Sequence, residues 1–300
     1  MAIATSLSSL LFSVVISVLS VQAVPLEPRQ SIAPISISQI NAFTPYTHFA
    51  STAYCLPSKT IDWSCGANCH ANPDFIPVDS GGDGSDVQYW YVGYSPSLRS
   101  VIVAHQGTNT SEIEAIATDV DLFLKNLDPT LFPGISSSIE CHSGFADEQA
   151  KTATDVLSAV QTALSTHGAA QVVVVGHSLG AAIALLDAVY LPLHLGVPVK
   201  AITYGMPRVG NQAFANYVDA HVGLTHINNM KDPVPIVPGR LLGYHHPSGE
   251  IHISENGSWE SCPGQDNTNK LCIVGDVPNI FEGKTANHGG PYNGITMGCS

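Results

Sequence analysis

The chain has 300 residues, 11 basic and 24 acidic, which gives a formal net charge of −13. An acidic chain without a basic stripe is a poor partner for nucleic acid or for an anionic membrane surface. Because charged residues make up only 12% and hydrophobic residues 44%, a disordered protein is excluded. The length suits one sizeable globular domain.

The N-terminus is typical of a secretory signal. Residues 10–21 are apolar, residues 1–23 contain no charge, and the segment ends in the small-residue pattern Val21-Gln22-Ala23. The apolar run is shorter than the roughly 20 residues that span a bilayer, so we expect no integral membrane segment in the mature chain. We predict a signal peptide at 1–23, a Pro-rich pro-segment or loose arm at 24–37, and one domain at 38–300.

The next part of the chain contains a helix signal and a hairpin signal. Residues 38–54 read as an amphipathic helix with a kink at Pro45, and residues 79–86 as a polar turn. Two runs rich in aromatic and β-branched residues, 87–93 and 100–104, lie on either side of a second turn. This pattern predicts a β-hairpin.

Strands and helices then alternate. Strand signals at 171–175, 199–204 and 225–229 are interleaved with helix signals at 145–166, 181–190 and 211–222. The run QVVVV shows no polar alternation, as expected of a strand buried on both faces. The alternation predicts right-handed crossovers, and therefore an α/β fold with a mostly parallel central sheet flanked by helices. The last 60 residues are rich in loops.

One short motif points to chemistry. Gly176-His177-Ser178-Leu179-Gly180 is a G-x-S-x-G sequence between a predicted buried strand and a predicted helix. A sharp strand-to-helix turn forces the serine into a strained conformation and leaves no room for side chains two residues away on either side. The helix N-terminus also favours negative charge that develops beside the serine. The alternative is a Gly-rich turn with an N-capping serine.

A nucleophilic serine needs a base, and in folds with this turn the chain order is serine, acid, histidine. Asp232 is the favoured acid because it follows a predicted strand and precedes Pro233, where an open α/β sheet collects its site residues. His288 lies in a Gly/Pro-rich loop, but chain position alone leaves His245 and His246 open. The remaining candidates after Ser178 are Asp187, Asp219, Glu250, Glu255, Asp266, Asp276, His194, His221, His226 and His252.

Four stretches carry a family resemblance: 174–182 (VVGHSLGAA), 203–211 (TYGMPRVGN), 232–235 (DPVP) and 244–250 (YHHPSGE). In these the chain resembles the fungal class 3 lipases, secreted α/β-hydrolases that include feruloyl esterases, over residues 38–300. The resemblance implies Ser178 as nucleophile, Asp232 as acid and His288 as base, and it places His245 and His246 in a structural segment.

The same resemblance implies an oxyanion hole made by the backbone N–H groups of Leu179 and Thr108, which would stabilise the tetrahedral intermediate. Two positions depart from the family. Gln106 stands where the family usually has Arg, and Tyr292 follows His288 by four residues where three are usual. Neither departure removes a reacting group.

Seven cysteines in a secreted chain indicate disulfides, with at least one cysteine unpaired. The family resemblance implies the pairs Cys55–Cys299, Cys65–Cys69 and Cys262–Cys272, and it leaves Cys141 as a buried thiol. Cys65, Cys69 and His70 could form half of a zinc site, but no second close pair completes it, so we expect no metal.

The family carries a lid between Thr108 and Cys141. Ile113, Ile116, Ala117 and Val120 form an apolar helical stripe, which predicts either an amphipathic lid near 109–121 or a plain surface helix. Apolar residues that follow could line an acyl groove or belong to the core; they are Leu122, Phe123, Leu124, Leu127, Leu131 and Phe132. Asn109 and Asn256 begin glycosylation sequons, of which the second is the better candidate.

We therefore expect a secreted, extracellular, monomeric serine ester hydrolase, a triacylglycerol lipase that acts on lipid or ester substrates without a cofactor. The first alternative is a feruloyl or other carboxylic esterase on the same scaffold. The second is a non-catalytic binding protein that kept the fold, against which the set Ser178, Asp232 and His288 argues.

Overall fold

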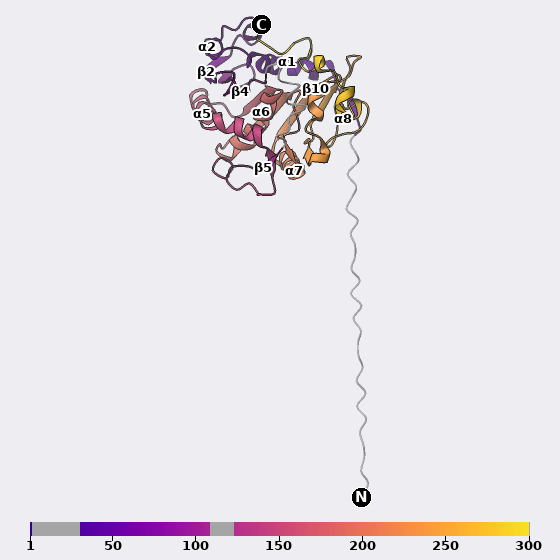
Figure 1. The fold of residues 1–300 in the computed structure, drawn as a ribbon. Helices are drawn as coiled ribbons and strands as arrows, with labels where there is room; N and C mark the ends of the chain where they lie inside the picture. The colour runs from indigo at the N-terminus through magenta and orange to yellow at the C-terminus, as the bar shows by residue number, and fades with distance from the viewer. Residues whose placement is uncertain (2–30, 109–122, 300) are drawn as a thin grey trace. The chain divides into compact units, whose positions relative to one another are not determined.

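Two sheets organise the part of the chain that the computed structural model describes, namely Met1 and residues 31–108 and 123–299 (Figure 1). The larger sheet has nine strands, in the order β1 (Ala33–Pro34), β13 (Trp259–Cys262), β12 (Glu250–Ile253), β10 (Gly223–Asn229), β8 (Val199–Tyr204), β7 (Val172–His177), β4 (Ser100–His105), β3 (Trp90–Ser95) and β2 (Ile76–Gly81). The smaller has the order β11 (Tyr244–His245), β9 (Gly210–Asn211), β6 (Glu140–His142) and β5 (Leu124–Asn126).

The centre of the large sheet is parallel. The strands β4, β7, β8, β10 and β12 pair in parallel, whereas β2, β3, β13 and β1 add antiparallel strands at the two sides. Parallel neighbours need crossover connections, and helices supply them between the central strands. The predicted mostly parallel α/β sheet is therefore confirmed.

Helices cover both faces of this sheet. The described helices are α1 (Ile37–Thr52), α2 (Pro57–Thr60), α3 (Ala67–Ala71), α5 (Ser143–His167), α6 (Leu179–Tyr190), α7 (Gln212–His221) and α8 (Ile273–Asp276), with short 3-10 turns η1 (Leu191–Leu193), η2 (Val234–Ile236), η3 (Arg240–Leu242), η4 (Ile280–Glu282) and η5 (Thr285–Asn287). α1 contacts β7 on one face, and α5 and α6 contact the central strands on the other. None of the helices in the described ranges has the length and apolar composition needed to cross a bilayer.

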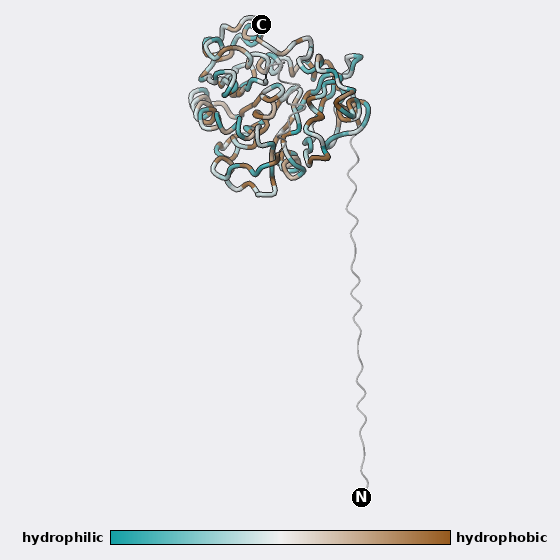
Figure 2. The backbone as a smooth tube through the Cα atoms, viewed as in Figure 1, coloured by the Kyte–Doolittle hydropathy of each residue, from teal (hydrophilic) through white to brown (hydrophobic). Residues whose placement is uncertain are grey.

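Strand β7 shows how the core is divided. Val172 and Val174 pack with α5 and α6 in one cluster, whereas Val173 and Val175 pack with Phe49 of α1 in the other. Because successive side chains of a strand point to opposite faces, a strand that is covered on both sides must be apolar throughout. Figure 2 shows the hydrophobic residues along these central strands.

Two segments differ from expectation. Residues 31–37 are not the end of a loose arm, because Ala33 and Pro34 pair with β13 and Ile35 donates its N–H to the Trp259 carbonyl at 3.0 Å. Residues 79–81 belong to β2 rather than to the predicted polar turn. Both are edge strands with weak strand signals, because β1 is only two residues long and contains Pro34, whereas residues 79–81 of β2 are Asp, Ser and Gly.

Candidate active site

Ser178 lies at the sharp turn between β7 and α6. Its φ of 59° is positive, which is strained for a residue with a side chain, and it is fully buried. A Cβ built on Gly176 would lie 2.2 Å from the Gly180 carbonyl oxygen, and one built on Gly180 would lie 2.3 Å from the His105 carbonyl oxygen. The two glycines of the motif are therefore required by backbone contacts on both sides of the serine.

Asp232 and His288 form a buried pair. His288 Nδ1 lies 2.8 Å from Asp232 Oδ2, while the Val234 N–H donates to Asp232 Oδ1 at 2.9 Å. A carboxylate accepts, so Nδ1 carries the proton that faces Asp232. This bond leaves Nε2 as the nitrogen that can accept a proton, and Nε2 has no hydrogen-bond partner among the described residues.

The histidine lies beside the serine turn. The ring of His288 is 4.3 Å from the ring of His177, centroid to centroid, and His177 Nε2 lies 2.8 Å from the His288 carbonyl oxygen. Ser178 Oγ, like His288 Nε2, is buried without a hydrogen-bond partner in the described ranges. Catalytic hydrogen bonds are often long before substrate binds, so this arrangement is compatible with a serine and base that engage on binding.

His177 belongs to a hydrogen-bond chain that sequence reasoning missed. Its Nε2 donates to the His288 carbonyl, so its Nδ1 accepts from the Tyr54 hydroxyl at 2.6 Å. Burial, and then the proximity of His288, hold the pKa of His177 well below its ordinary value. His177 is therefore neutral and fixed beside the ring that would take up a proton. His177 could have been found from its position in the G-x-S-x-G motif, but no sequence signal pointed to Tyr54.

The candidate oxyanion donors come from two elements. Leu179 begins α6, and Thr108 follows β4 through Gln106 and Gly107. A Cβ on Gly107 would lie 2.4 Å from the His177 carbonyl oxygen, so this loop packs directly on the serine turn. At the position where the family usually has Arg, the Gln106 side chain accepts the Tyr89 N–H at 2.9 Å. Gln106 therefore keeps the loop tied to the adjoining backbone.

The other candidate histidines have different partners. The ring of His246 stacks on that of His226 at 4.9 Å and its Nε2 lies 2.7 Å from the Pro235 carbonyl oxygen. Burial lowers the pKa of both to about 3. His245 lies 3.4 Å from an Asp266 oxygen. These contacts give the YHHPSGE segment a structural position, as the family resemblance implies.

The alternative acids are also engaged elsewhere. Asp187 lies 2.7 Å from His105, Asp219 accepts from Ser248, and Asp266 accepts from Arg208. Glu250 accepts the Ile273 N–H at 2.6 Å, and burial raises the pKa of its carboxyl to about 8. Of the candidates, the structure brings Asp232 next to His288.

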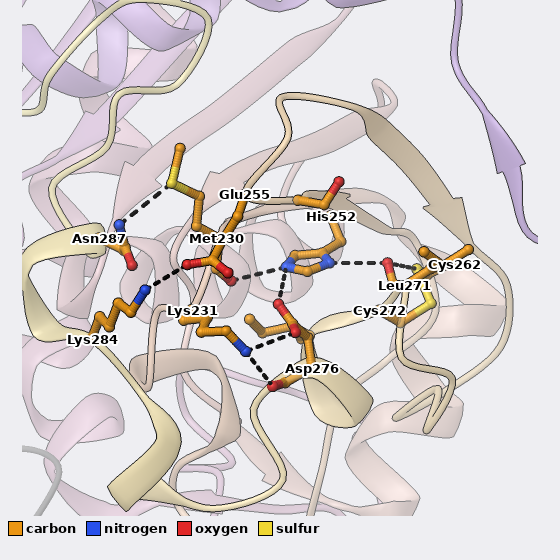
Figure 3. Close-up of polar contacts among 12 residues, drawn as sticks. Met230, Lys231, His252, Glu255, Cys262, Leu271, Cys272, Asp276, Lys284 and Asn287 are labelled. Carbon is orange, nitrogen blue, oxygen red and sulfur yellow. Dashed lines mark hydrogen bonds and ion pairs between the residues drawn. A yellow bond between two sulfur atoms is a disulfide. The ribbon is translucent and has the colours of Figure 1, made fainter.

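A polar network joins the loop of the acid to the loop of the histidine (Figure 3). The two ring nitrogens of His252 lie 2.9 Å from the carbonyl oxygens of Met230 and Leu271. Lys231 forms an ion pair with Asp276 at 3.0 Å, and Asn287 contacts the Met230 sulfur at 3.4 Å. Because Met230 and Lys231 precede Asp232 and Asn287 precedes His288, the network holds both loops in place.

All three disulfides implied by the resemblance are present: Cys55–Cys299, Cys65–Cys69 and Cys262–Cys272. Cys141 is a free, buried thiol in β6, and burial raises its pKa to about 12. The Cys65–Cys69 bond leaves neither sulfur as a thiolate for zinc. The same holds for Cys262 and Cys272, which lie beside Glu250.

The predicted lid, 109–121, and the sequon at Asn109 lie outside the described residues, as does Leu122. Leu127 and Phe132 are buried in the cluster below α5 and α6, which assigns them to the core rather than to an acyl groove. Phe123 is exposed.

Comparison with known proteins places this geometry in a family. The family model "Lipase (class 3)" matches residues 102–242. The secreted mono- and diacylglycerol lipase MDL4 of Malassezia globosa is 32% identical over 92% of this chain and 90% of its own length. MDL2 of the same species is 34% identical over 73% of this chain and 72% of its own length. A solved triacylglycerol lipase, described as having a serine-protease triad at its catalytic centre, superposes with a TM-score of 0.76 at 26% identity over 90% of this chain and 100% of its own.

Proposed function

Since this chain belongs to the class 3 lipase family and is a carboxylic ester hydrolase, we propose that Ser178, His288 and Asp232 catalyse the hydrolysis of acylglycerol esters. The observation that carries this proposal is the buried Asp232–His288 pair, whose Nε2 has no other partner in the described part of the chain and whose ring lies beside the strained turn of Ser178. Geometry and family therefore support the same three residues.

In the proposed reaction, Ser178 Oγ attacks the ester carbonyl carbon while His288 Nε2 takes the hydroxyl proton. The negative charge that forms on the carbonyl oxygen is held by the backbone N–H groups of Leu179 and Thr108, donors of a kind worth ~3–4 kcal/mol each. Asp232 keeps His288 in the required tautomer and stabilises its protonated form.

The tetrahedral intermediate then collapses. The bond to the leaving alkoxide oxygen breaks as His288 donates its proton, which releases the alcohol and leaves Ser178 acylated. A water molecule, deprotonated by the same Nε2, attacks the acyl carbon. The bond from that carbon to Ser178 Oγ then breaks as His288 returns the proton to Oγ, which releases the fatty acid and restores the enzyme. The neutral state of His177 serves this cycle, because a second cation beside protonated His288 would destabilise it.

The substrate we propose is triacylglycerol, as for the solved relative, with mono- and diacylglycerols as the second candidate because the two Malassezia relatives carry those names. Rates on emulsified triolein, diolein and monoolein, and on a feruloyl and a butyryl ester, separate the possibilities. Faster turnover of the feruloyl ester than of every glyceride would replace the lipase proposal by a feruloyl esterase.

The residue assignment has its own test. An organophosphonate should label Ser178, and Ser178→Ala should fold with an unchanged circular dichroism spectrum while it loses both labelling and turnover. Folded wild-type protein that neither turns over an ester nor reacts with the reagent would instead indicate a binding protein.

We also propose that residues 1–23 are a signal peptide and that the mature protein is extracellular, as the names of the relatives support. N-terminal sequencing of protein from the medium tests the cleavage site. A monomer and a lid at 109–121 complete the proposal. Gel filtration tests the first, and a jump in activity when tributyrin passes its solubility limit tests the second. Asn256 lies in an exposed turn, which suits a glycan.

A further inference from the structure

A second histidine–aspartate pair lies in the core, apart from Asp232 and His288. His105 Nε2 lies 2.7 Å from Asp187 Oδ2, and the Gln149 amide donates to Asp187 Oδ1 at 2.9 Å. All three side chains are at most 1% exposed. Since a carboxylate oxygen only accepts, His105 Nε2 is the donor, and each oxygen of Asp187 is held by one side-chain N–H.

The pair joins the two elements that carry the candidate oxyanion donors. His105 is the last residue of β4 and precedes the loop that ends in Thr108, whereas Asp187 lies in α6, the helix that begins at Leu179. Gln149 comes from α5, which packs against α6. One buried cluster therefore connects the strand before one donor to the helix that supplies the other.

The close backbone contact between α6 and β4 lies at the start of the helix. At its start, Gly180 packs against the carbonyl oxygens of His105 and Gln106, so closely that a Cβ would lie 2.3 Å and 2.6 Å from them. Asp187 follows Gly180 by seven residues, which puts it on the same helical face two turns later. A second contact two turns along the axis fixes the direction of the helix as well as its distance from β4.

The contact between β4 and α6 is polar although it is buried, and this needs an explanation. Taking a carboxylate out of water is costly, and apolar residues of similar volume often stabilise a core better than a buried polar pair does. Apolar packing, however, tolerates sliding, whereas a hydrogen bond is restricted in both distance and angle. The cluster is thus better suited to alignment than to stability.

We propose that His105 and Asp187, supported by Gln149, are positioning residues that set the Thr108 N–H relative to the Leu179 N–H. The inference rests on the proposed function, since it takes these two N–H groups as the oxyanion hole. Neither side chain is placed to touch substrate, so both act through the backbone that they hold. Donor placement matters most in the transition state, where the negative charge is present.

Two substitutions of His105 separate alignment from stability. His105→Phe keeps a planar ring but has no donor, whereas His105→Gln places an amide N–H near the position of Nε2. With p-nitrophenyl butyrate below its solubility limit, we expect kcat of His105→Phe to fall roughly 10- to 100-fold, with KM within twofold of wild type. His105→Gln should recover most of the loss.

A boronic acid that binds Ser178 as a tetrahedral adduct provides a second readout. Its inhibition constant should rise in His105→Phe by about the factor by which kcat/KM falls. The matched control is Val160→Ala, which opens a cavity in α5 away from the site. It should lower the melting temperature and leave kcat and the inhibition constant unchanged.

The proposal is overturned if His105→Phe melts earlier but keeps kcat within twofold of wild type, or if His105→Gln is as slow as His105→Phe. Should His105→Phe fail to fold, Gln149→Leu decides. A two- to fivefold lower kcat at constant KM supports the proposal, and an unchanged kcat refutes it. Ser178→Ala, assayed in parallel, keeps the two claims apart, because an active Ser178→Ala would contradict the proposed function itself.

Discussion

The central parallel strands and the segment 230–299 are held in place by different forces. In β7 the four positions before Gly176 are buried valines, and β8 begins with buried Val199 and Ala201, between two layers of helices. In 230–299 the buried residues include Asp232, His252 and Asp266, and a disulfide joins Cys262 to Cys272.

The difference follows from what each region must do. Continuous apolar strands fix a sheet through burial, which is non-directional and tolerates small shifts. Placing an imidazole next to a serine requires bonds with direction, and the contacts around His252, Lys231 and Asn287 supply them. Substitutions of apolar residues in the core should therefore cost stability, and substitutions of the polar residues that hold Asp232 and His288 should cost catalysis.

The largest effect is expected for Asp232→Asn. The amide keeps an oxygen for the Val234 N–H but no longer holds His288 in the required tautomer, so kcat should fall on the order of 10³–10⁴-fold. The melting temperature should change little. Kinetics on a soluble ester and a thermal melt test both statements, and a kcat within tenfold of wild type would contradict the role given to Asp232.

The next largest effect is expected for removal of the Cys55–Cys299 disulfide, which joins the segment after α1 to the C-terminal segment. Cys55 and Cys299 are 244 residues apart, and closing so long a loop restricts the unfolded chain by about 4–5 kcal/mol in the entropic model. The double variant Cys55→Ser, Cys299→Ser should lose stability of that order in urea unfolding. The Cys262–Cys272 bond closes a much shorter loop, with a separation of 10 residues, so the double variant Cys262→Ser, Cys272→Ser should lose less. An equal loss would contradict the entropic account.

The core prediction is smaller. Val160 of α5 is fully buried in the cluster that includes Val174, and Val160→Ala should lower the free energy of unfolding by about 2 kcal/mol. Because no site residue depends on it, kcat should stay within twofold of wild type. A large loss of kcat would contradict the comparison, since it would show that apolar packing in the core positions the site residues as strictly as hydrogen bonds do.

The smallest effect, taken per pH unit, is a slope of stability against pH. Burial raises the pKa of Glu250 in the folded protein from 4.5 to about 8, so the folded state holds a proton that the unfolded state releases above pH 4.5. The stabilisation is complete below pH 4.5 and is lost as the pH rises through 8, by at most about 1.4 kcal/mol per pH unit.

Glu250→Gln keeps an oxygen for the Ile273 N–H and removes the titration. Plotted against pH, the melting temperature of this variant should decline less than that of wild type between pH 5 and pH 8. Parallel curves over that range would show that Glu250 is not the group responsible.

The sequence predicted the sheet better than the last third of the chain. The strand at 199–204 was placed at its observed bounds, and the helices at 145–166 and 181–190 within about two residues, because uniform burial leaves a clear periodic signal. By contrast, β12 and β13 were missed. Their signal is broken by buried polar residues such as His252, which the fold retains for hydrogen bonds.

For the site, the sequence predicts what depends on neighbouring residues and does not predict contacts between residues far apart in the chain. The motif around Ser178 and the loop position of Asp232 follow from local pattern, and the structure places both as expected. The choice of His288 over His245 and His246, and the disulfide pairing, depended on the family resemblance, because contacts across 56 or 244 residues leave no periodic trace. The pairing of His105 with Asp187 gives no local signal, and Asp187 is only one of several candidate acids, since each residue lies in an otherwise apolar run.

The buried thiol of Cys141 can report local opening of the small sheet, because a reagent can label it only when β6 is exposed. Closed β6 offers a labelling reagent neither access nor thiolate, because burial raises the thiol pKa to about 12. When β6 opens, the reagent can reach the thiol and the pKa of the thiol returns towards its ordinary value. The alkylation rate at fixed pH therefore measures how often the small sheet opens. Mass spectrometry of alkylated protein would therefore follow the opening of β6 without an introduced probe.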